Sequence, residues 1–208
     1  SISIFAGANG AVTRDHVDES LSWLTAGDIV LVQQEVPAAA VAHSLELARK
    51  ANAISILNIA PVIPETRDLV DMADIVIANE TEFAGTFDVS EDDFLDAASR
   101  WVTRSGRTLV VTIGAKGAIL VEANDEAEIS TVKPPKVEVV ATVGAGDTFC
   151  GYFAAGIAKG QALKTALEDA VVASALACQR HGAQAPMPFE SEVRNFRRTN
   201  HPVLHEAG

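Results

Sequence analysis

The chain has 208 residues, 48% of them hydrophobic, which is enough to build one globular domain with a proper core. Sixteen basic residues against 28 acidic ones leave a formal net charge of −12, and such a surface disfavours nucleic acid and membrane partners. Two cysteines in apolar contexts without CxxC spacing, and the absence of an apolar run long enough to span a bilayer, favour a reduced cytoplasmic protein.

Strands and helices alternate along almost the whole sequence. Apolar runs of the kind buried in parallel sheets predict strands at residues 1–6, 29–32, 53–59, 74–77, 108–113 and 117–121, with a weaker edge strand at 126–132. Apolar residues at helical spacing predict helices that begin near Thr13 and Pro37, and further helices at residues 66–72, 80–85, 90–104, 152–159, 161–180 and 190–198.

This alternation predicts an α/β fold: a single three-layer α/β/α domain over residues 1–208 with a mostly parallel, Rossmann-like central sheet. In such sheets ligands bind at the carboxyl ends of the strands. Polar residues follow the predicted strands there, and together they indicate a site: Asn9, Glu35, Asn58, Asn79, Glu82 and Asp147.

The most informative stretch is VVATVGAGDTFCG at residues 139–151, where an apolar β-branched run enters a glycine turn before a helix. Gly144 and Gly146 carry no Cβ and let the backbone approach a ligand closely. The unpaired first amides of the helix and its dipole can cradle an anion, most often phosphate, and Asp147 beside them is a candidate base. Taken alone, the turn is equally compatible with simple helix punctuation.

Two common nucleotide motifs do not fit this turn. A G-x-G-x-x-G fingerprint would need a third glycine at position 149, which is Phe149. No Gly-Lys-Ser/Thr follows the glycines, so the turn is not a P-loop either.

The turn resembles the second signature of the ribokinase-like (PfkB) sugar kinases, a D-T-x-G-A-G-D sequence that opens a helix. Further segments are similar to that family in the same order, most closely to its ribokinase branch: GAN at 7–9, VQQEVP at 32–37, LNIAP at 57–61, NETE at 79–82, TIGAKG at 112–117 and GAQ at 182–184. The family's amino-terminal third, with its first glycine-rich signature and small β-sheet lid, has no counterpart. We therefore expect a piece of a longer polypeptide. Its oligomeric state stays open between a monomer and a homodimer, because relatives often dimerise through the lid.

The resemblance implies transfer of the γ-phosphoryl group of ATP to a primary hydroxyl of a furanose-type sugar, D-ribose first. Asp147 would be the general base, and Glu35 would accept hydrogen bonds from the sugar. A solvated loop glutamate before Pro37 is the alternative interpretation of Glu35. The anion hole for the transferred oxygens would be built from backbone amides, those of Gly144, Ala145 and Gly146.

For the nucleotide, the resemblance implies that Asn79 and Glu82 hold Mg²⁺ and phosphates through water. A helix-start Asn with an acidic first turn would look the same in sequence. Lys116 would add a positive charge, although a plain hairpin lysine is as good an interpretation. The residues implied to line the phosphates and base are Thr112, Ile113, Gly114, Ala115, Lys116 and Gly117, with Gly146.

The family's activating K⁺ loop is only partly represented. Ala141 stands where the family usually has Asp, and Pro186 stands where ribokinases commonly have Ser. Loss of two side-chain oxygens should weaken a site for a hard cation, so we expect weak or absent K⁺ activation. Backbone carbonyls that could still form part of the loop are those of Val143, Ala177, Arg180 and Gly182.

Two other functions stay open at this point. One is a kinase for another sugar or a nucleoside, because the segments that choose the acceptor lie mostly in the absent third. The other is a nucleotide-binding module without activity of its own. Asp147, Asn79 and Glu82 are all present, which argues against a degenerate kinase.

Overall fold

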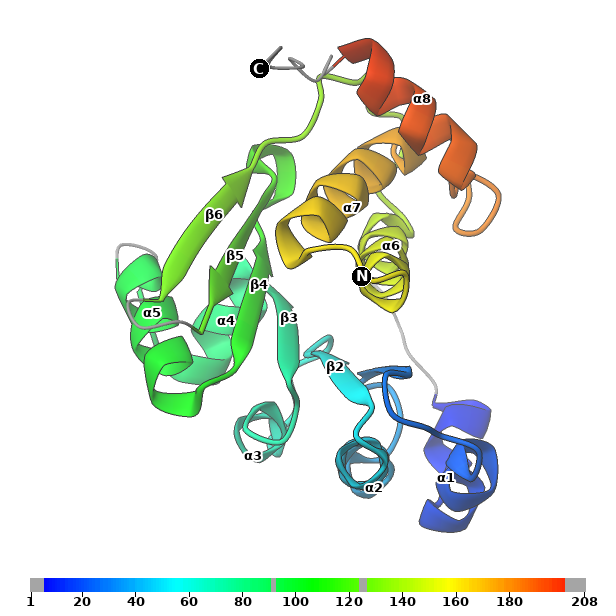
Figure 1. Ribbon diagram of the computed structural model, residues 1–208, viewed down its shortest axis with the longest axis vertical. Coiled ribbons are helices and arrows are strands. Elements are labelled where there is room, and N and C mark those ends of the chain that lie inside the picture. Colours follow the sequence, from blue (N-terminus) through cyan, green and yellow to red (C-terminus); the bar gives the residue numbers. More distant parts are fainter. Residues whose placement is uncertain (1–5, 91–92, 124–126, 201–208) are drawn as a thin grey trace. The chain divides into compact units, whose positions relative to one another are not determined.

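The computed structural model describes residues 6–90, 93–123 and 127–200 (Figure 1). The chain divides into two units, one of residues 1–114 and 118–131 and the other of residues 115–117 and 132–208. Neither unit is a continuous stretch of sequence. The strand predicted at residues 1–6 lies, except for Ala6, outside the described residues.

The first unit is built on a sheet whose six strands follow one another in space in sequence order. Strands β1 to β4 pair in parallel, and β5 runs antiparallel to β4. The strands are β1 (Ile29–Gln33), β2 (Ile54–Asn58), β3 (Ile75–Asn79), β4 (Thr108–Thr112), β5 (Ala118–Glu122) and β6 (Glu128–Val132). The predicted mostly parallel α/β sheet is therefore confirmed, with each described strand within a few residues of its predicted place.

Helices α2 to α5 lie along one face of this sheet (Figure 1). Their apolar sides form one core with the strands, centred on aromatic contacts of Phe83 with Phe87 and Phe94. The helices of this unit are the 3₁₀ helix η1 (Gly7–Ala11) and the α-helices α1 (Arg14–Leu21), α2 (Ala38–Ala51), α3 (Thr66–Val70), α4 (Glu80–Phe87) and α5 (Phe94–Ser105). Thr13 caps α1 as predicted, because its side chain accepts a hydrogen bond from the His16 N–H.

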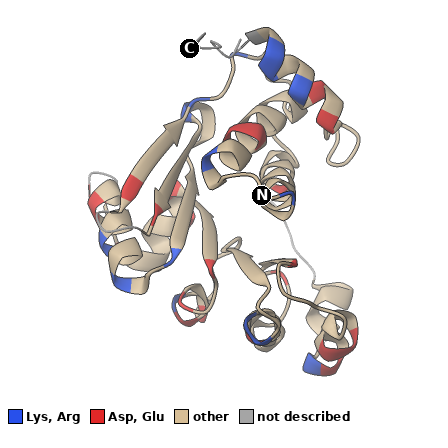
Figure 2. Ribbon diagram, in the orientation of Figure 1, with Lys and Arg blue, Asp and Glu red and all other residues tan. Residues whose placement is uncertain are grey.

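The second unit consists mainly of three helices, α6 (Ala145–Ala158), α7 (Leu163–Ala177) and α8 (Glu190–Asn200), with part of the short 3₁₀ helix η2 (Gly114–Lys116). Val193 of α8 packs against Val172 and Ala173 of α7. Acidic residues lie in the first turn of α8 and basic residues in its last turn, which complements the helix dipole (Figure 2). No described helix is both long and apolar enough to cross a membrane.

Asp147 is grouped above with residues that follow predicted strands, but no strand precedes the glycine turn. Residues 133–143 contain no strand. The N–H groups of Val140 and Ala141 instead donate to the carbonyl oxygen of Cys178, at 2.8 and 3.1 Å, just after the end of α7. A helix end leaves carbonyls without intrahelical partners, and this apolar segment satisfies one of them. The following helix also begins at Ala145, earlier than the predicted residue 152.

The contact between α6 and α7 depends on Gly156. A Cβ at this position would lie 2.8 Å from the Ala166 Cβ and 2.4 Å from the Gln161 Oε1. We expect Gly156→Ala to lower the free energy of unfolding by about 1–3 kcal/mol, as overpacking does. Gly151→Ala in the same helix, where a Cβ meets nothing within 4 Å, should instead raise it by about 0.5–1 kcal/mol. Urea denaturation measures both, and equal effects would contradict the packing argument.

Candidate active site

The glycine turn that begins α6 adopts a backbone conformation that glycine favours. Gly144 is the N-cap of α6 with φ 77° and ψ 1°, in the left-handed region. A Cβ on Gly144 would lie 2.6 Å from the carbonyl oxygen of Ala183, in the connection between α7 and α8. The turn is therefore held against that connection by contact between two backbones. This contact requires a glycine.

Some N–H groups at the start of α6 donate hydrogen bonds within the protein, and others have no acceptor there. The Ala145 N–H donates to the Thr142 carbonyl oxygen at 3.2 Å, and the Thr148 N–H donates to that of Gly144 at 2.9 Å. The N–H groups of Gly144, Gly146 and Asp147 have no acceptor among the described residues. The anion hole predicted from the sequence thus includes the Ala145 amide, which closes the turn, and omits the Asp147 amide, which is open. An anion at this helix start would meet open donors and the positive end of the dipole.

Asp147 is exposed in the first turn of α6, at the third helical position. A carboxylate at this position often reaches back to the N-cap amide in a capping box. Here no side chain caps the helix, and the Asp147 carboxylate has no hydrogen bond or ion pair within the described parts of the chain. The carboxylate is thus not used to build the helix start, and both oxygens can accept a proton or a hydrogen bond from a ligand.

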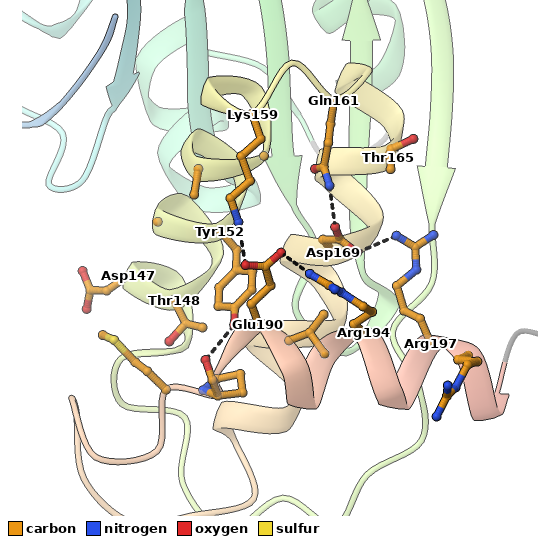
Figure 3. A pocket seen from close by; sticks show the side chains of 17 residues that line it. Asp147, Thr148, Tyr152, Lys159, Gln161, Thr165, Asp169, Glu190, Arg194 and Arg197 are labelled. Carbon is orange, nitrogen blue, oxygen red and sulfur yellow. Dashed lines mark hydrogen bonds and ion pairs between the residues drawn. The ribbon is translucent and has the colours of Figure 1, made fainter.

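A cavity of about 910 Å³ extends from Asp147 along α6, between α6, α7 and α8 (Figure 3). Tyr152 in its wall donates a hydrogen bond to the Pro188 carbonyl oxygen at 2.6 Å and so ties the segment before α8 to α6. Burial, helped by the nearby carboxylates of Glu190, Glu192 and Asp169, raises the pKa of the Tyr152 hydroxyl, which keeps it a donor. The sequence motifs gave no sign of this cavity, because it depends on helix packing.

The charged residues around the cavity are largely paired with one another. Glu190 accepts hydrogen bonds from Lys159 and Arg194, both at 2.7 Å. Arg197 on α8 bridges to Asp169 and Glu168 on α7. These pairs join α8 to α6 and α7, and in Figure 3 they lie away from Asp147. These paired groups neutralise each other, whereas the Asp147 carboxylate has no partner among the described residues.

In the first unit, Asn58 and Asn79 end the neighbouring parallel strands β2 and β3 and so lie at one edge of the sheet, whereas Asn9 lies in η1. The parallel registers place Gln33 opposite Asn58 and Asn79 opposite Thr112. Glu35 is exposed two residues after the end of β1. Lys116 is exposed in η2.

Asn79 and Glu82 form a complete capping box at the start of α4. The Asn79 Oδ1 accepts from the Glu82 N–H, and the Glu82 Oε2 accepts from the Asn79 N–H, both at 2.8 Å. The structure thus contains the helix-start arrangement that sequence reasoning weighed as the alternative. The Glu82 Oε1 has no partner among the described residues, and a carboxylate oxygen suits Mg²⁺ held through water.

The residues predicted around a K⁺ loop lie on three segments that meet beside the glycine turn. Ala141 donates to Cys178, Gly144 lies against Ala183, and the Arg180 N–H donates to the Ala177 carbonyl oxygen at 3.4 Å. The oxygen donors among the predicted residues are backbone carbonyls, and that of Ala177 is already hydrogen bonded. This set fits a hard cation in donor type but lacks a charged ligand. The members of the set are Ala141, Val143, Ala177, Arg180 and Gly182.

Comparison with known proteins identifies the class. The pfkB family of carbohydrate kinases matches residues 1–190, and the chain belongs to this family. The ribokinase of Staphylococcus aureus is 32% identical over 197 residues, covering 93% of this chain and 64% of that protein.

Two solved structures have the same fold. A ribokinase from Thermotoga maritima matches with a TM-score of 0.80 and 30% identity, covering 95% of this chain and 65% of the other. A ribokinase from Arabidopsis thaliana, solved with ribose and ATP, matches with a TM-score of 0.80 and 28% identity over 94% of this chain and 64% of the other. The predicted resemblance to the ribokinase-like fold is confirmed. The chain spans a little under two thirds of the length of these relatives.

The two glycines of the turn should respond differently to a side chain. Gly144→Ala combines a strained φ with a backbone contact and should lower the free energy of unfolding by about 1–3 kcal/mol. Gly146→Ala, where a Cβ meets nothing within 4 Å, should leave stability unchanged or slightly higher. Thermal unfolding of the two variants tests this. A Gly144→Ala variant as stable as Gly146→Ala would mean that the turn does not need its contact with Ala183.

Proposed function

We propose that the complete protein is an ATP-dependent sugar kinase that phosphorylates a primary hydroxyl, with D-ribose as its acceptor. The observation that carries this proposal is the unengaged Asp147 carboxylate beside the open amides at the start of α6. Membership of the pfkB family supports the phosphoryl-transfer chemistry. The similarity to the Staphylococcus aureus ribokinase and to the Arabidopsis thaliana ribokinase solved with ribose and ATP supports the choice of acceptor and donor.

In this mechanism Asp147 accepts the proton of the sugar hydroxyl as its oxygen forms a bond to the γ-phosphorus of ATP. The bond from the γ-phosphorus to the bridging oxygen of ADP breaks, and ADP leaves. Phosphoryl transfer needs positioning and charge stabilisation more than covalent help from the protein. The N–H groups of Gly146 and Asp147, with that of Gly144, supply donors for the charge on the transferred oxygens.

The remaining roles are those that the resemblance to the pfkB family implies. Glu35 would accept hydrogen bonds from sugar hydroxyls, since this residue is exposed and its carboxylate makes no hydrogen bond or ion pair within the described residues. Glu82 would hold Mg²⁺ through water with its Oε1, which the capping box leaves over, and Asn79, whose Oδ1 accepts from the Glu82 N–H, would donate its side-chain amide N–H to a phosphate oxygen. When bound, Mg²⁺ neutralises charge on the phosphates of ATP. Residues 112–117, with Lys116 exposed, would line the nucleotide.

Replacing the base tests the central assignment. In the complete polypeptide, Asp147→Asn should lower kcat with D-ribose and ATP by about 10²–10⁴-fold, because the amide cannot accept the proton. ATP should bind as well or better, because a negative charge near the phosphates is removed. Coupled ADP release and calorimetric ATP binding measure the two effects.

The matched control is Asp15→Asn, which changes another exposed first-turn aspartate, on α1. It should leave both quantities unchanged. Turnover that survives in Asp147→Asn would remove Asp147 as the base. If the wild-type protein phosphorylates a different furanose sugar or a nucleoside and not D-ribose, the proposed mechanism stands and the assigned acceptor is wrong.

The K⁺ dependence of the rate follows from the donor set beside the turn. With Ala141 in place of a carboxylate, KCl should give the same kcat as tetramethylammonium chloride at equal ionic strength. Ala141→Asp adds the missing negative charge and should introduce a rate increase that is specific to K⁺. A large K⁺ activation in the unmodified protein would show that the carbonyls alone suffice.

A further inference from the structure

Ser174, on α7, contacts the backbone of the glycine turn. Its hydroxyl donates a hydrogen bond to the carbonyl oxygen of Ala145 at 3.0 Å. Ala145 is the first residue of α6, so this bond joins the middle of one helix to the beginning of another. Ser174 is half-buried, in a helix whose neighbouring positions Ala173 and Ala175 are buried. No sequence motif singled it out.

The acceptor of this bond belongs to the same peptide unit as an open donor of the site. The Ala145 carbonyl and the Gly146 N–H belong to one planar peptide group, so a bond that orients the carbonyl also orients the N–H. A hydrogen bond to the carbonyl oxygen also polarises the group and strengthens its N–H as a donor, since chains of hydrogen bonds reinforce one another. The Gly146 N–H has no acceptor among the described residues and lies next to Asp147.

Other hydroxyls in the structure make bonds of a similar length without this link to the site. The Ser44 hydroxyl donates to the Ala40 carbonyl oxygen at 2.9 Å, one turn earlier in its own helix. The Thr148 hydroxyl donates to the Gly144 carbonyl oxygen at 2.8 Å. That bond polarises the Ala145 N–H, which is already used by Thr142. Ser174 is thus placed to act on a donor that stays open for a ligand.

We propose that Ser174 is a positioning residue for phosphoryl transfer, which aims and polarises the Gly146 N–H toward the transferred phosphoryl oxygens. The proposal rests on the proposed kinase function. The donor should matter most when charge develops on those oxygens, so its loss should lower kcat more than it weakens ground-state binding.

The test is Ser174→Ala in the complete polypeptide, with Ser174→Thr as the variant that keeps the hydroxyl and Ser44→Ala as the matched control. Ser174→Ala should lower kcat by about five-fold, the effect of one ordinary hydrogen bond, with the KM values for sugar and ATP little changed. Ser174→Thr should restore most of the rate. Ser44→Ala removes the same kind of hydroxyl-to-carbonyl bond in the other unit and should keep the wild-type kcat.

A second readout does not depend on activity. In ¹⁵N–¹H NMR spectra, the Gly146 amide resonance should move in Ser174→Ala and stay in place in Ser44→Ala. If the Gly146 resonance moves in Ser174→Ala but the wild-type protein shows no turnover, the hydrogen bond from Ser174 is supported and the proposed kinase function is contradicted. A normal kcat in Ser174→Ala, or a Gly146 amide that does not move, would overturn the proposal. A loss of stability equal in Ser174→Ala and Ser44→Ala, with kcat lowered in both, would assign Ser174 a purely structural role.

Discussion

The backbone contact between Gly144 and Ala183 is the constraint on which the candidate site depends. It brings the connection after α7 to within 2.6 Å of where a side chain would stand, and so fixes how the chain enters α6. With the entry fixed, the Ala145 amide turns inward to Thr142 while those of Gly146 and Asp147 stay open. The chemistry of the turn thus follows from a steric condition that only glycine meets at a φ of 77°.

Two helix starts in this chain illustrate opposite uses of the same backbone groups. At α4, side-chain oxygens of Asn79 and Glu82 accept hydrogen bonds from backbone N–H groups of the helix start. These bonds stabilise the helix and leave fewer N–H donors for a ligand. At α6 no side chain caps the helix, although Asp147 stands at the same helical position as Glu82 does in α4. Glycine at the N-cap in place of a capping side chain costs only about a few tenths of a kcal/mol, and it retains donors for an anion. Packing of α6 against α7 offsets this cost.

Much of the fold could be predicted from sequence, because buried parallel strands and amphipathic helices have strong periodic patterns. The family was also predictable, since its motifs occur in order along the chain. The apolar β-branched run before the glycine turn forms no strand, because such a run does not reveal its partner, which here is the end of α7 at Cys178. Ser174, Tyr152 and the cavity beside Asp147 depend on contacts between distant residues, and local sequence carries no signal for these. The roles of Glu35, Asn79, Glu82 and Lys116 remain predictions.

The connection between β4 and β5 has a consequence for how this chain can vary. Residues 115–117 lie between two strands of the first unit but group with the second, where Gly117 lies too close to the Val132 carbonyl oxygen for any side chain. No single cut in the polypeptide therefore separates the two units. Gene fusion or recombination at one breakpoint could not exchange either unit as a module. A change in the length of this short connection would alter the structure of both units, so we expect insertions and deletions here to be tolerated badly.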